Sequence, residues 1–224
     1  MEKSASAKIV ADFNERGIFI GGPPSLFHVA GKKQLAILKH FGLTKSSKVL
    51  DIGCGCLRGG RWVIPELEKG HYFGIEPNKN MLQNGLDFCI DKTILLDKEP
   101  KFDNNHDFNF EIFKNKFDFF IARSIWSHAS KSQIEKMLDQ FISSKSESGI
   151  FLTSYHRTRI PFFREYHGKE WVGKSHSSNE GGVVRHSFGR IKRLCNARNL
   201  EVKEMIDNRF DFGTQRWLII KINF

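Results

Sequence analysis

The chain has 224 residues, and its 35 Lys and Arg against 25 Asp and Glu give a net charge of +10 at pH 7. Its length suits one domain with a core of its own, and its composition, 40% hydrophobic and 27% charged, excludes a disordered tail, a collagen-like repeat and a disulfide scaffold. The net charge alone leaves nucleic acid, an anionic membrane surface and an acidic substrate open as partners.

The apolar segments are too short for a membrane-spanning helix, which needs ~20 continuous apolar residues. The longest stretch without charge begins at Gly17 and is interrupted by Gly21, Gly22, Pro23 and Pro24. No apolar run follows the first few residues, so we expect no secretory signal. Four cysteines are too few for a disulfide framework, so we expect reduced thiols, a cytoplasmic protein and no membrane partner.

The first 44 residues are predicted to be an N-terminal arm and helix that cover the core. Leu35, Leu38 and Phe41 are spaced as on one face of a helix, which we expect to end near Gly42. The segment before it, with Phe27 and a Gly-Gly-Pro-Pro run, either folds over a ligand or packs as an arm. We therefore divide the chain into this arm and a main domain over residues 45–224.

Short and almost continuously apolar runs predict the strands of the main domain. They cover residues 49–52, 72–75, 117–121 and 149–153. Strands of this kind have both faces buried, which is typical of a parallel sheet between two layers of helices.

Helices are predicted between these strands. Apolar residues recur at helical spacing, namely Met81, Leu82, Leu86 and Ile90, then Ile134, Met137, Leu138, Phe141 and Ile142, then Phe188, Ile191 and Cys195. Ser132 and Glu135 have the spacing of a capping box at the start of the second helix. Ser187 is the expected N-cap of the third.

The last two strand-like runs, residues 201–206 and 217–222, are too close for a helix between them. We therefore expect them to be antiparallel. Strands that alternate with helices, followed by such a pair, predict an α/β sandwich with a mostly parallel sheet.

A glycine-rich turn follows the first strand, with the sequence Asp51-Ile52-Gly53-Cys54-Gly55. In α/β sheets ligands bind at the carboxyl ends of the strands, and glycines there allow a close approach of the backbone. Arg58 occupies the place of the third glycine of the nicotinamide fingerprint, and no Gly-Lys-Ser/Thr follows as in a phosphate-binding loop. Cys54 and Cys56 lack the further ligands of a zinc site, so no metal is expected.

The segment Val49–Gly55 resembles the first motif of class I S-adenosylmethionine-dependent methyltransferases. Glu76 follows Asp51 by 25 residues at the end of the second strand. Residues 105–108 resemble the third motif, and residues 117–128 resemble the fourth strand and the turn beside the methyl donor. The resemblance covers about residues 45–224. It implies a Rossmann-like three-layer α/β/α sandwich, a seven-stranded sheet with an antiparallel last strand, and S-adenosylmethionine as cofactor.

The resemblance also implies a set of cofactor-binding residues. An acid such as Glu76 accepts hydrogen bonds from both ribose hydroxyls, Asp107 meets the adenine amino group, and Phe108 packs on the ring. Asp51 organises the turn or meets the donor amino group through water, and Arg58 meets the methionine carboxylate. The whole set is Asp51, Gly53, Cys54, Gly55, Arg58, Glu76, Pro77, Asp107, Phe108 and Arg123. The usual third glycine of the motif is Leu57 here.

Methyl transfer mainly requires that the reactants be oriented, and a hydroxyl nucleophile also needs a base. His128 follows the fourth strand and is the first candidate base, although a histidine here also serves to stabilise the next helix. Tyr155 and His156 follow the fifth strand as further catalytic candidates. Metal-binding relatives have a Glu-His pair at this place, whereas Ser127 precedes His128.

The expected substrate-binding residues are Trp126, Arg157 and Arg159, with Trp126 either a wall of the methionine pocket or part of the core. Residues 155–186 are predicted to be a substrate-binding insertion. A net charge of +7 lies within residues 155–198. Because the excess gathers beyond the fifth strand, it favours an anionic acceptor over nucleic acid.

The sequence therefore predicts a methyltransferase that acts on a small anionic acceptor, with an oxygen nucleophile favoured. Two alternatives stay open. An RNA methyltransferase is compatible with the charge, although no RNA-binding module or Asn-Pro-Pro-Tyr-like motif is present. A protein that binds S-adenosylmethionine without catalysis is the other.

Overall fold

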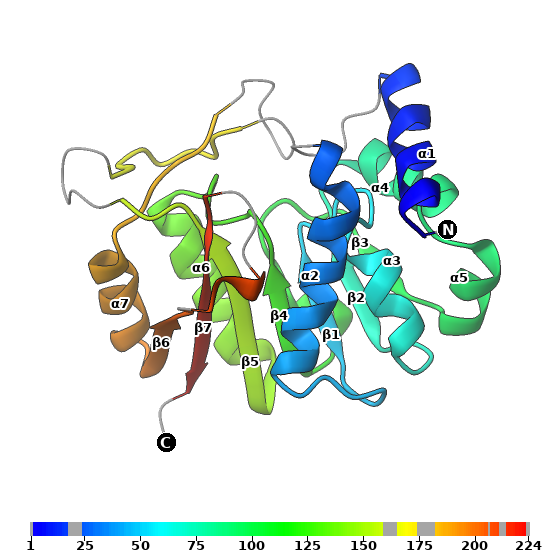
Figure 1. The fold of residues 1–224 in the computed structure, drawn as a ribbon. Coiled ribbons are helices and arrows are strands. Elements are labelled where there is room, and N and C mark those ends of the chain that lie inside the picture. Colours follow the sequence, from blue (N-terminus) through cyan, green and yellow to red (C-terminus); the bar gives the residue numbers. More distant parts are fainter. Residues whose placement is uncertain are drawn as a thin grey trace.

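The computed structural model describes residues 2–17, 24–158, 165–173, 182–205, 207–210 and 214–222. The predicted substrate-binding residue Arg159 lies outside them. One seven-stranded sheet runs through the described part of the chain in the order β3-β2-β1-β4-β5-β7-β6 (Figure 1). The strands are β1 Val49–Ile52, β2 Tyr72–Ile75, β3 Lys101–Asp103, β4 Phe117–Ala122, β5 Lys145–Tyr155, β6 Leu200–Glu204 and β7 Arg216–Ile222.

The strand directions confirm the predicted fold class. β1 pairs in parallel with β2 and β4, as do β2 with β3 and β4 with β5. β7 runs antiparallel to both of its neighbours, β5 and β6. The carboxyl ends of β1 to β5 therefore lie at one edge of the sheet, where ligands bind in folds of this kind.

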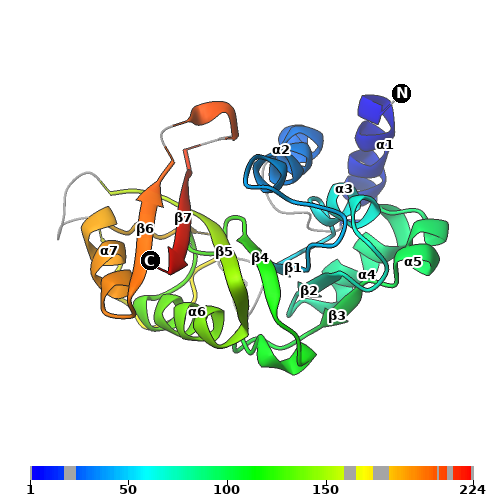
Figure 2. The same cartoon turned by 90° about the horizontal axis from the view of Figure 1, so that it is seen from below.

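Helices cover both faces of the sheet (Figure 2). Their bounds are α1 Glu2–Glu15, α2 Phe27–His40, α3 Gly60–Val63, α4 Lys79–Phe88, α5 Lys92–Lys98, α6 Lys131–Ser144 and α7 Phe188–Asn196, with short 3₁₀ turns at Pro24–Leu26, Ile64–Glu66, Glu111–Phe113 and Asn208–Phe210. Side chains of α6 and α7 share one buried cluster with the sheet, and those of α2 and α4 share another. Among the described residues, no helix has the length and apolar character needed to cross a bilayer.

The side chains of β5 alternate between these two clusters. Phe151 and Tyr155 pack with α6 and α7, whereas Leu152 packs in the cluster of α2. Alternation with a period of two is the rule in an extended strand. It decides which of the polar residues at the end of β5 share a site.

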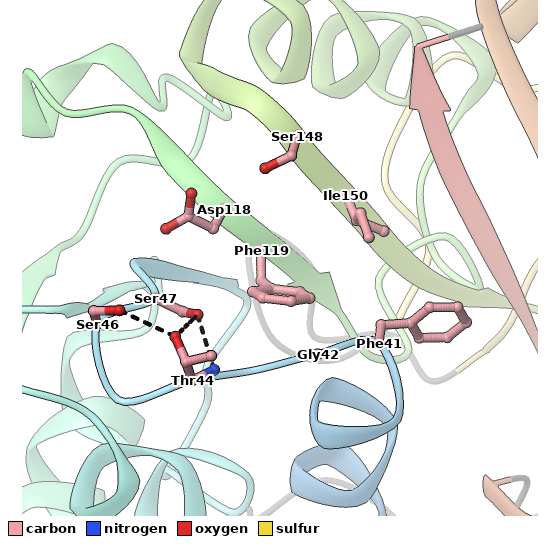
Figure 3. Close-up of a pocket in the computed structure, with 9 residues that line it drawn as sticks. All are labelled: Phe41, Gly42, Thr44, Ser46, Ser47, Asp118, Phe119, Ser148 and Ile150. Atoms are coloured by element: carbon pink, nitrogen blue, oxygen red, sulfur yellow. Dashed lines mark hydrogen bonds between the residues drawn. The ribbon is translucent and has the colours of Figure 1, made fainter. Parts of the chain in front are cut away.

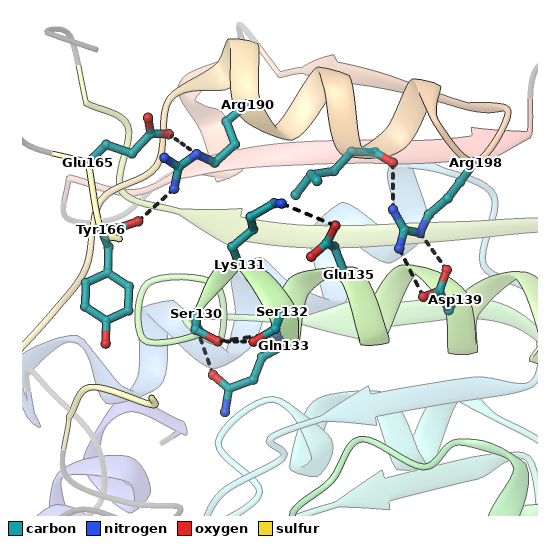
Figure 4. Close-up of polar contacts among 11 residues, drawn as sticks. Ser130, Lys131, Ser132, Gln133, Glu135, Asp139, Glu165, Tyr166, Arg190 and Arg198 are labelled. Atoms are coloured by element: carbon teal, nitrogen blue, oxygen red, sulfur yellow. Dashed lines mark hydrogen bonds and ion pairs between the residues drawn. The ribbon is translucent and has the colours of Figure 1, made fainter. Parts of the chain in front are cut away.

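The start of α7 is as predicted: the Ser187 hydroxyl accepts a hydrogen bond from the backbone N–H of Arg190 at 3.2 Å. The predicted capping box of α6 is wrong by two residues. Ser130 and Gln133 form it, because α6 begins at Lys131 and Ser130 has the extended backbone of an N-cap, with φ of −72° and ψ of 170°. Ser132 lies inside the helix next to Ser130 (Figure 4).

Candidate functional site

The turn after β1 depends on residues with positive φ. Gly53 and Gly55 have φ of +71° and +58°, a region that costs little only for glycine. A Cβ on Gly53 would also lie 2.2 Å from Cδ1 of Ile125, in the turn after β4. Leu57 stands at the place of the third glycine in the motif that this turn resembles, and it too has a φ of +58°. Its side chain is fully buried, so packing compensates for the strained backbone.

Glu76 lies at the end of β2 and faces this turn. Its Oε2 accepts a hydrogen bond from the N–H of Gly55 at 2.9 Å, and its Oε1 accepts one from the N–H of Asn78 at 2.9 Å. Burial raises the pKa of Glu76, and the two backbone N–H groups act in the opposite sense. Each carboxylate oxygen has two acceptor sites, so each can accept one further hydroxyl. The arrangement fits a vicinal diol.

Asp51 lies in β1 beneath the turn and is almost fully buried. Its Oδ2 accepts a hydrogen bond from the Tyr72 hydroxyl at 2.6 Å. Burial raises the pKa of Asp51 to about 7 even though this hydrogen bond favours the carboxylate. Asp51 thus ties β1 to β2 at the point where the glycine turn begins.

The structure places Asp107 and Phe108, the two residues expected at the adenine, in different surroundings. Phe108 is buried, but Asp107 is exposed and pairs with Lys136 of α6 at 3.4 Å. Asn104, which sequence reasoning passed over, lies nearer the site: its Nδ2 donates to the Glu76 carbonyl at 2.7 Å. Since Asn104 shares no motif with Glu76, only the parallel pairing of β2 with β3 reveals this contact.

Arg58 and Pro77 flank the turn on its helical side. The guanidinium of Arg58 stacks over the ring of Phe27 in α2, 5.3 Å from its centroid, and burial lowers the pKa of Arg58. Pro77 is half-buried and precedes Asn78, the N-cap of α4, whose Oδ1 accepts from the N–H of Met81 at 3.0 Å.

A polar network joins the ends of β4, β5 and β7. Gln215 accepts hydrogen bonds from Arg123 and from the Ser154 hydroxyl, and its Nε2 donates to the Ser124 hydroxyl at 2.7 Å. The Ser154 hydroxyl also accepts from the N–H of Ser124 at 2.8 Å. Of these four residues sequence reasoning named only Arg123. Gln215 carries no motif, and it reaches the site only through the antiparallel pairing of β7 with β5.

His128 fastens part of the predicted insertion to the turn after β4. Its Nδ1 lies 2.7 Å from the Val172 carbonyl, and the N–H of Val172 donates to the His128 carbonyl at 3.0 Å. The ring stacks on Trp171, with centroids 5.4 Å apart. A Cβ on Gly173 would lie 2.4 Å from Nδ1, so only glycine fits there. Burial lowers the pKa of His128, which favours a neutral ring that donates from Nδ1.

Tyr155 and His156 have different neighbours, as the alternation of β5 requires. The Tyr155 hydroxyl donates to Glu204 of β6 at 2.7 Å, and Arg157 pairs with the same carboxylate. The Nδ1 atom of His156 lies 3.1 Å from the hydroxyl oxygen of Thr214. Burial lowers the pKa of His156, and nearby Arg185, Arg123 and His128 add to the effect. The structure therefore brings His156 toward Arg123 and His128, and Tyr155 toward β6.

Trp126 was expected either to form a wall of the methionine pocket or to belong to the core, and it lies in the core. It is fully buried and packs edge-to-face on Phe151 at 5.8 Å.

Part of the positive charge of residues 155–198 is used in ion pairs. Arg190 pairs with Glu165 at 2.9 Å and Arg198 with Asp139 at 2.6 Å (Figure 4). Arg157 pairs with Glu204. Within the described ranges, four cations of this segment form no ion pair, and they are Lys169, Arg185, Lys192 and Arg193. Arg185 is the one of these that lies near His156.

A separate cavity of about 360 Å³ opens at the opposite edge of the sheet (Figure 3). Its lining residues are Phe41, Gly42, Thr44, Ser46, Ser47, Asp118, Phe119, Ser148 and Ile150. The Asp118 carboxylate there already accepts from the N–H of Lys48 and from the Ser146 hydroxyl. The cavity lies at the amino ends of β4 and β5, away from the glycine turn.

Over the described ranges, no three His, Cys, Asp or Glu side chains gather as a set of metal ligands. The prediction that no metal takes part stays a prediction.

Comparison with known proteins identifies the fold. No family model matches the chain, and no curated protein matches it in sequence. Solved structures do match. An S-adenosylmethionine-dependent methyltransferase from Clostridium acetobutylicum has a TM-score of 0.65 at 11% identity, over 88% of this chain and 92% of the other. The glycopeptide N-methyltransferase MtfA has a TM-score of 0.64 at 11% identity, over 87% and 90%.

A third match is the magnesium protoporphyrin IX methyltransferase ChlM from Synechocystis PCC 6803, solved with bound S-adenosylmethionine. It gives a TM-score of 0.62 at 15% identity and covers 98% of this chain and 97% of the other. The chain therefore has the Rossmann-like fold of S-adenosylmethionine-dependent methyltransferases.

Proposed function

We propose that this protein is an S-adenosylmethionine-dependent methyltransferase that acts on a small anionic acceptor through an oxygen nucleophile. The observation that carries the proposal is the Glu76 carboxylate, held by the N–H groups of Gly55 and Asn78 where β1 and β2 end. A buried carboxylate beside a glycine turn is the chemistry that a ribose diol requires. The solved structure of ChlM with S-adenosylmethionine supports the choice of ligand.

The donor supplies an electrophilic methyl group on a sulfonium, and the protein binds and orients it. Glu76 would accept the two ribose hydroxyls, and Phe108 would offer a buried aromatic surface to the adenine. The backbone of the glycine turn would lie along the methionine part, because positive φ turns its N–H groups away from the strand direction. The remaining expected contacts come from Asp51, Cys54, Arg58, Pro77 and Arg123.

His156 is the base that the geometry favours for an oxygen nucleophile. Its lowered pKa keeps the ring neutral at pH 7, and a neutral ring is what a general base needs. Its Nδ1 is placed by the Thr214 hydroxyl, which leaves Nε2 for the acceptor. His128 is the second candidate, although its ring is stacked on Trp171 and bound to Val172.

The acceptor side of the site supports an anion. Arg185 is exposed and lies near His156, and Arg123 comes to the same place from the end of β4. An acceptor that carries an anionic group besides the hydroxyl that takes the methyl group would be drawn by that anionic group between these guanidinium groups. Arg157 is held in an ion pair by Glu204, and it would contact the acceptor only at the outer side of the site.

Labelled S-adenosylmethionine incubated with a cell extract and the protein tests this proposal. We expect methyl label in a small-molecule fraction that an anion-exchange resin retains, and much less label with Glu76→Gln at the same donor concentration. Label in RNA that is lost as salt rises would favour an RNA methyltransferase. If the protein binds the donor but no fraction acquires label, the protein binds S-adenosylmethionine without catalysing methyl transfer.

A further inference from the structure

A small cluster of buried side chains lies between the glycine turn and the helices α1, α2 and α4. Its members are Phe13, Phe27, Cys56, Met81 and Cys89. It is separate from the two large clusters of the sheet, and the helices α1 and α4, which contribute Phe13 and Met81 to it, lie at one side of the molecule (Figure 1). Two of the four cysteines of the chain therefore meet directly behind the candidate donor site.

The geometry of α4 brings these cysteines together. Met81, Gly85 and Cys89 lie four residues apart, on one face of the helix. A Cβ on Gly85 would lie 2.6 Å from the carbonyl carbon of Cys56, and one on Gly55 would lie 3.4 Å from Sδ of Met81. Because α4 packs this tightly on residues 55–56, Cys89 lies beside Cys56, and the two side chains are hydrogen-bonded.

The hydrogen bond between the two thiols makes them unequal. The hydrogen bond from Cys89 lowers the pKa of Cys56, and Arg58 acts in the same direction against the effect of burial. The same hydrogen bond and burial raise the pKa of Cys89, although Arg61 and Arg58 lie nearby. The thiolate is the nucleophile in sulfur chemistry, so the lowered pKa favours Cys56 as the attacking thiol and leaves Cys89 as the resolving one.

We propose that Cys56 and Cys89 form a reversible oxidation site, in which a hydroperoxide converts the hydrogen-bonded thiols to a disulfide. The Cys56 thiolate attacks one oxygen of hydrogen peroxide, the O–O bond breaks, and hydroxide leaves to give a sulfenic acid. The sulfur of Cys89 then attacks Cys56, the S–S bond forms, and water leaves with the proton of Cys89. Two thiols are oxidised while one peroxide is reduced to two waters. An added dithiol reverses the reaction.

Oxidation of Cys56 would affect the donor site through the neighbouring residue, Gly55. Cys56 follows Gly55, whose N–H holds Oε2 of Glu76. An S–S bond of about 2.05 Å is much shorter than a contact between hydrogen-bonded thiols, so the disulfide draws the turn toward α4 and away from Glu76. We expect donor affinity to fall about tenfold. This consequence rests on the proposed function, whereas the disulfide does not.

The disulfide is tested by treating the full chain with hydrogen peroxide, unfolding it and alkylating the free thiols. Peptide mass spectrometry is expected to show a Cys56–Cys89 disulfide that dithiothreitol removes, with Cys54 and Cys195 alkylated. Cys89→Ser should instead accumulate sulfenic and sulfinic acid at Cys56, and Cys195→Ser, a buried cysteine of α7, should behave as the wild type. Four alkylated cysteines in the wild type, or another pairing, would overturn the site.

Calorimetry with S-adenosylhomocysteine on the oxidised and reduced wild-type protein tests the coupling. We expect the oxidised form to bind about tenfold more weakly. Equal affinities in the two forms would overturn the coupling. If the reduced protein fails to bind at all, the proposed function is wrong, and the peptide map still decides the oxidation site.

Discussion

Two buried carboxyl groups, Asp51 and Glu76, stand on neighbouring strands but have different partners. Glu76 accepts from two backbone N–H groups, whereas Asp51 accepts from the hydroxyl of Tyr72. Burial raises the pKa of both groups. The raised pKa of Asp51, about 7, means that folding adds a proton to it at mildly acidic pH.

The Asp51→Asn variant tests the protonation of Asp51. The pKa of Asp51 is about 7 in the folded chain against 3.8 for an unperturbed Asp, so the folded state binds more protons between these values. The contribution of Asp51 to the free energy of unfolding should therefore fall as pH rises from about 4 to 7, by at most about 1.4 kcal/mol per pH unit. In urea unfolding, the pH profile of Asp51→Asn should differ from that of the wild type by this slope, and the exposed Asp97→Asn should keep the wild-type profile. Parallel profiles for wild type and Asp51→Asn would contradict the assignment.

Replacing Glu76 by Gln removes one acceptor oxygen and the negative charge. Hydrogen bonds to a charged group contribute about 1.5–3 kcal/mol, so we expect affinity for S-adenosylhomocysteine to fall about 10- to 100-fold by calorimetry. Glu68→Gln, at an exposed position before β2, should bind as the wild type does. Equal dissociation constants for Glu76→Gln and the wild type would exclude the ribose contact.

At the scale of elements, the alternation of β5 decides which predicted residues meet. Sequence proximity placed Tyr155 and His156 in one catalytic group. Because strand residues alternate, Tyr155 contacts Glu204 on the side of α7, while His156 lies with Thr214 and the Arg123 network. The helix caps show the same limit. Two overlapping serine spacings occur at the start of α6, and the residue at which the helix begins, which the sequence does not fix, selects Ser130.

His156→Ala should lower the single-turnover rate of methyl transfer about 10²- to 10⁴-fold, which is the usual contribution of a general base. The acceptor for this assay is the fraction labelled in the extract experiment. His167→Ala, at an exposed position of the same insertion, serves as the matched control. If His156→Ala transfers methyl at the wild-type rate at neutral pH, the base is elsewhere and His128 is the next residue to replace.

His128→Ala removes a stacked ring and a hydrogen bond that hold Trp171 and Val172. A lost buried hydrogen bond costs about 1–3 kcal/mol, and each kcal/mol shifts Tm by about 2–4 °C in a chain of this size. We expect Tm to fall by about 2–12 °C in calorimetric melting, with His167→Ala close to the wild type. An unchanged Tm would mean that His128 does not fasten this segment.

For the whole molecule, the sheet was predictable because its strands are apolar on both faces, as in Val49–Ile52 and Phe117–Ala122. β3 gave no such signal, since it has three residues and none is buried. The glycine turn after β1 and the acid that follows β2 were predictable from a motif and its spacing, and the structure joins them through the hydrogen bond from Gly55 to Glu76. Contacts that depend on the pairing of strands far apart in the sequence could not be predicted, and for this reason the contacts of Asn104 and Gln215 were not expected.

The position of the excess positive charge could be predicted from the sequence, but the ion pairs of these charges could not. The sequence locates the positive excess beyond β5, but it does not pair Arg198 with Asp139 of α6 or Arg157 with Glu204 of β6. The guanidinium groups that lie near His156 are those of Arg185, which follows β5, and Arg123, which stands at the end of β4. The excess therefore supports an anionic acceptor through a few residues and not through its total.

Binding of S-adenosylhomocysteine to the reduced wild-type protein is the most direct test of the central claim. Titration calorimetry should show one site per chain, with a dissociation constant within or below the roughly 1 μM–1 mM range typical of enzyme ligands. The absence of binding heat at millimolar ligand, with protein shown to be folded by its cooperative melting, would contradict the claim that this turn and Glu76 form a methyl-donor site.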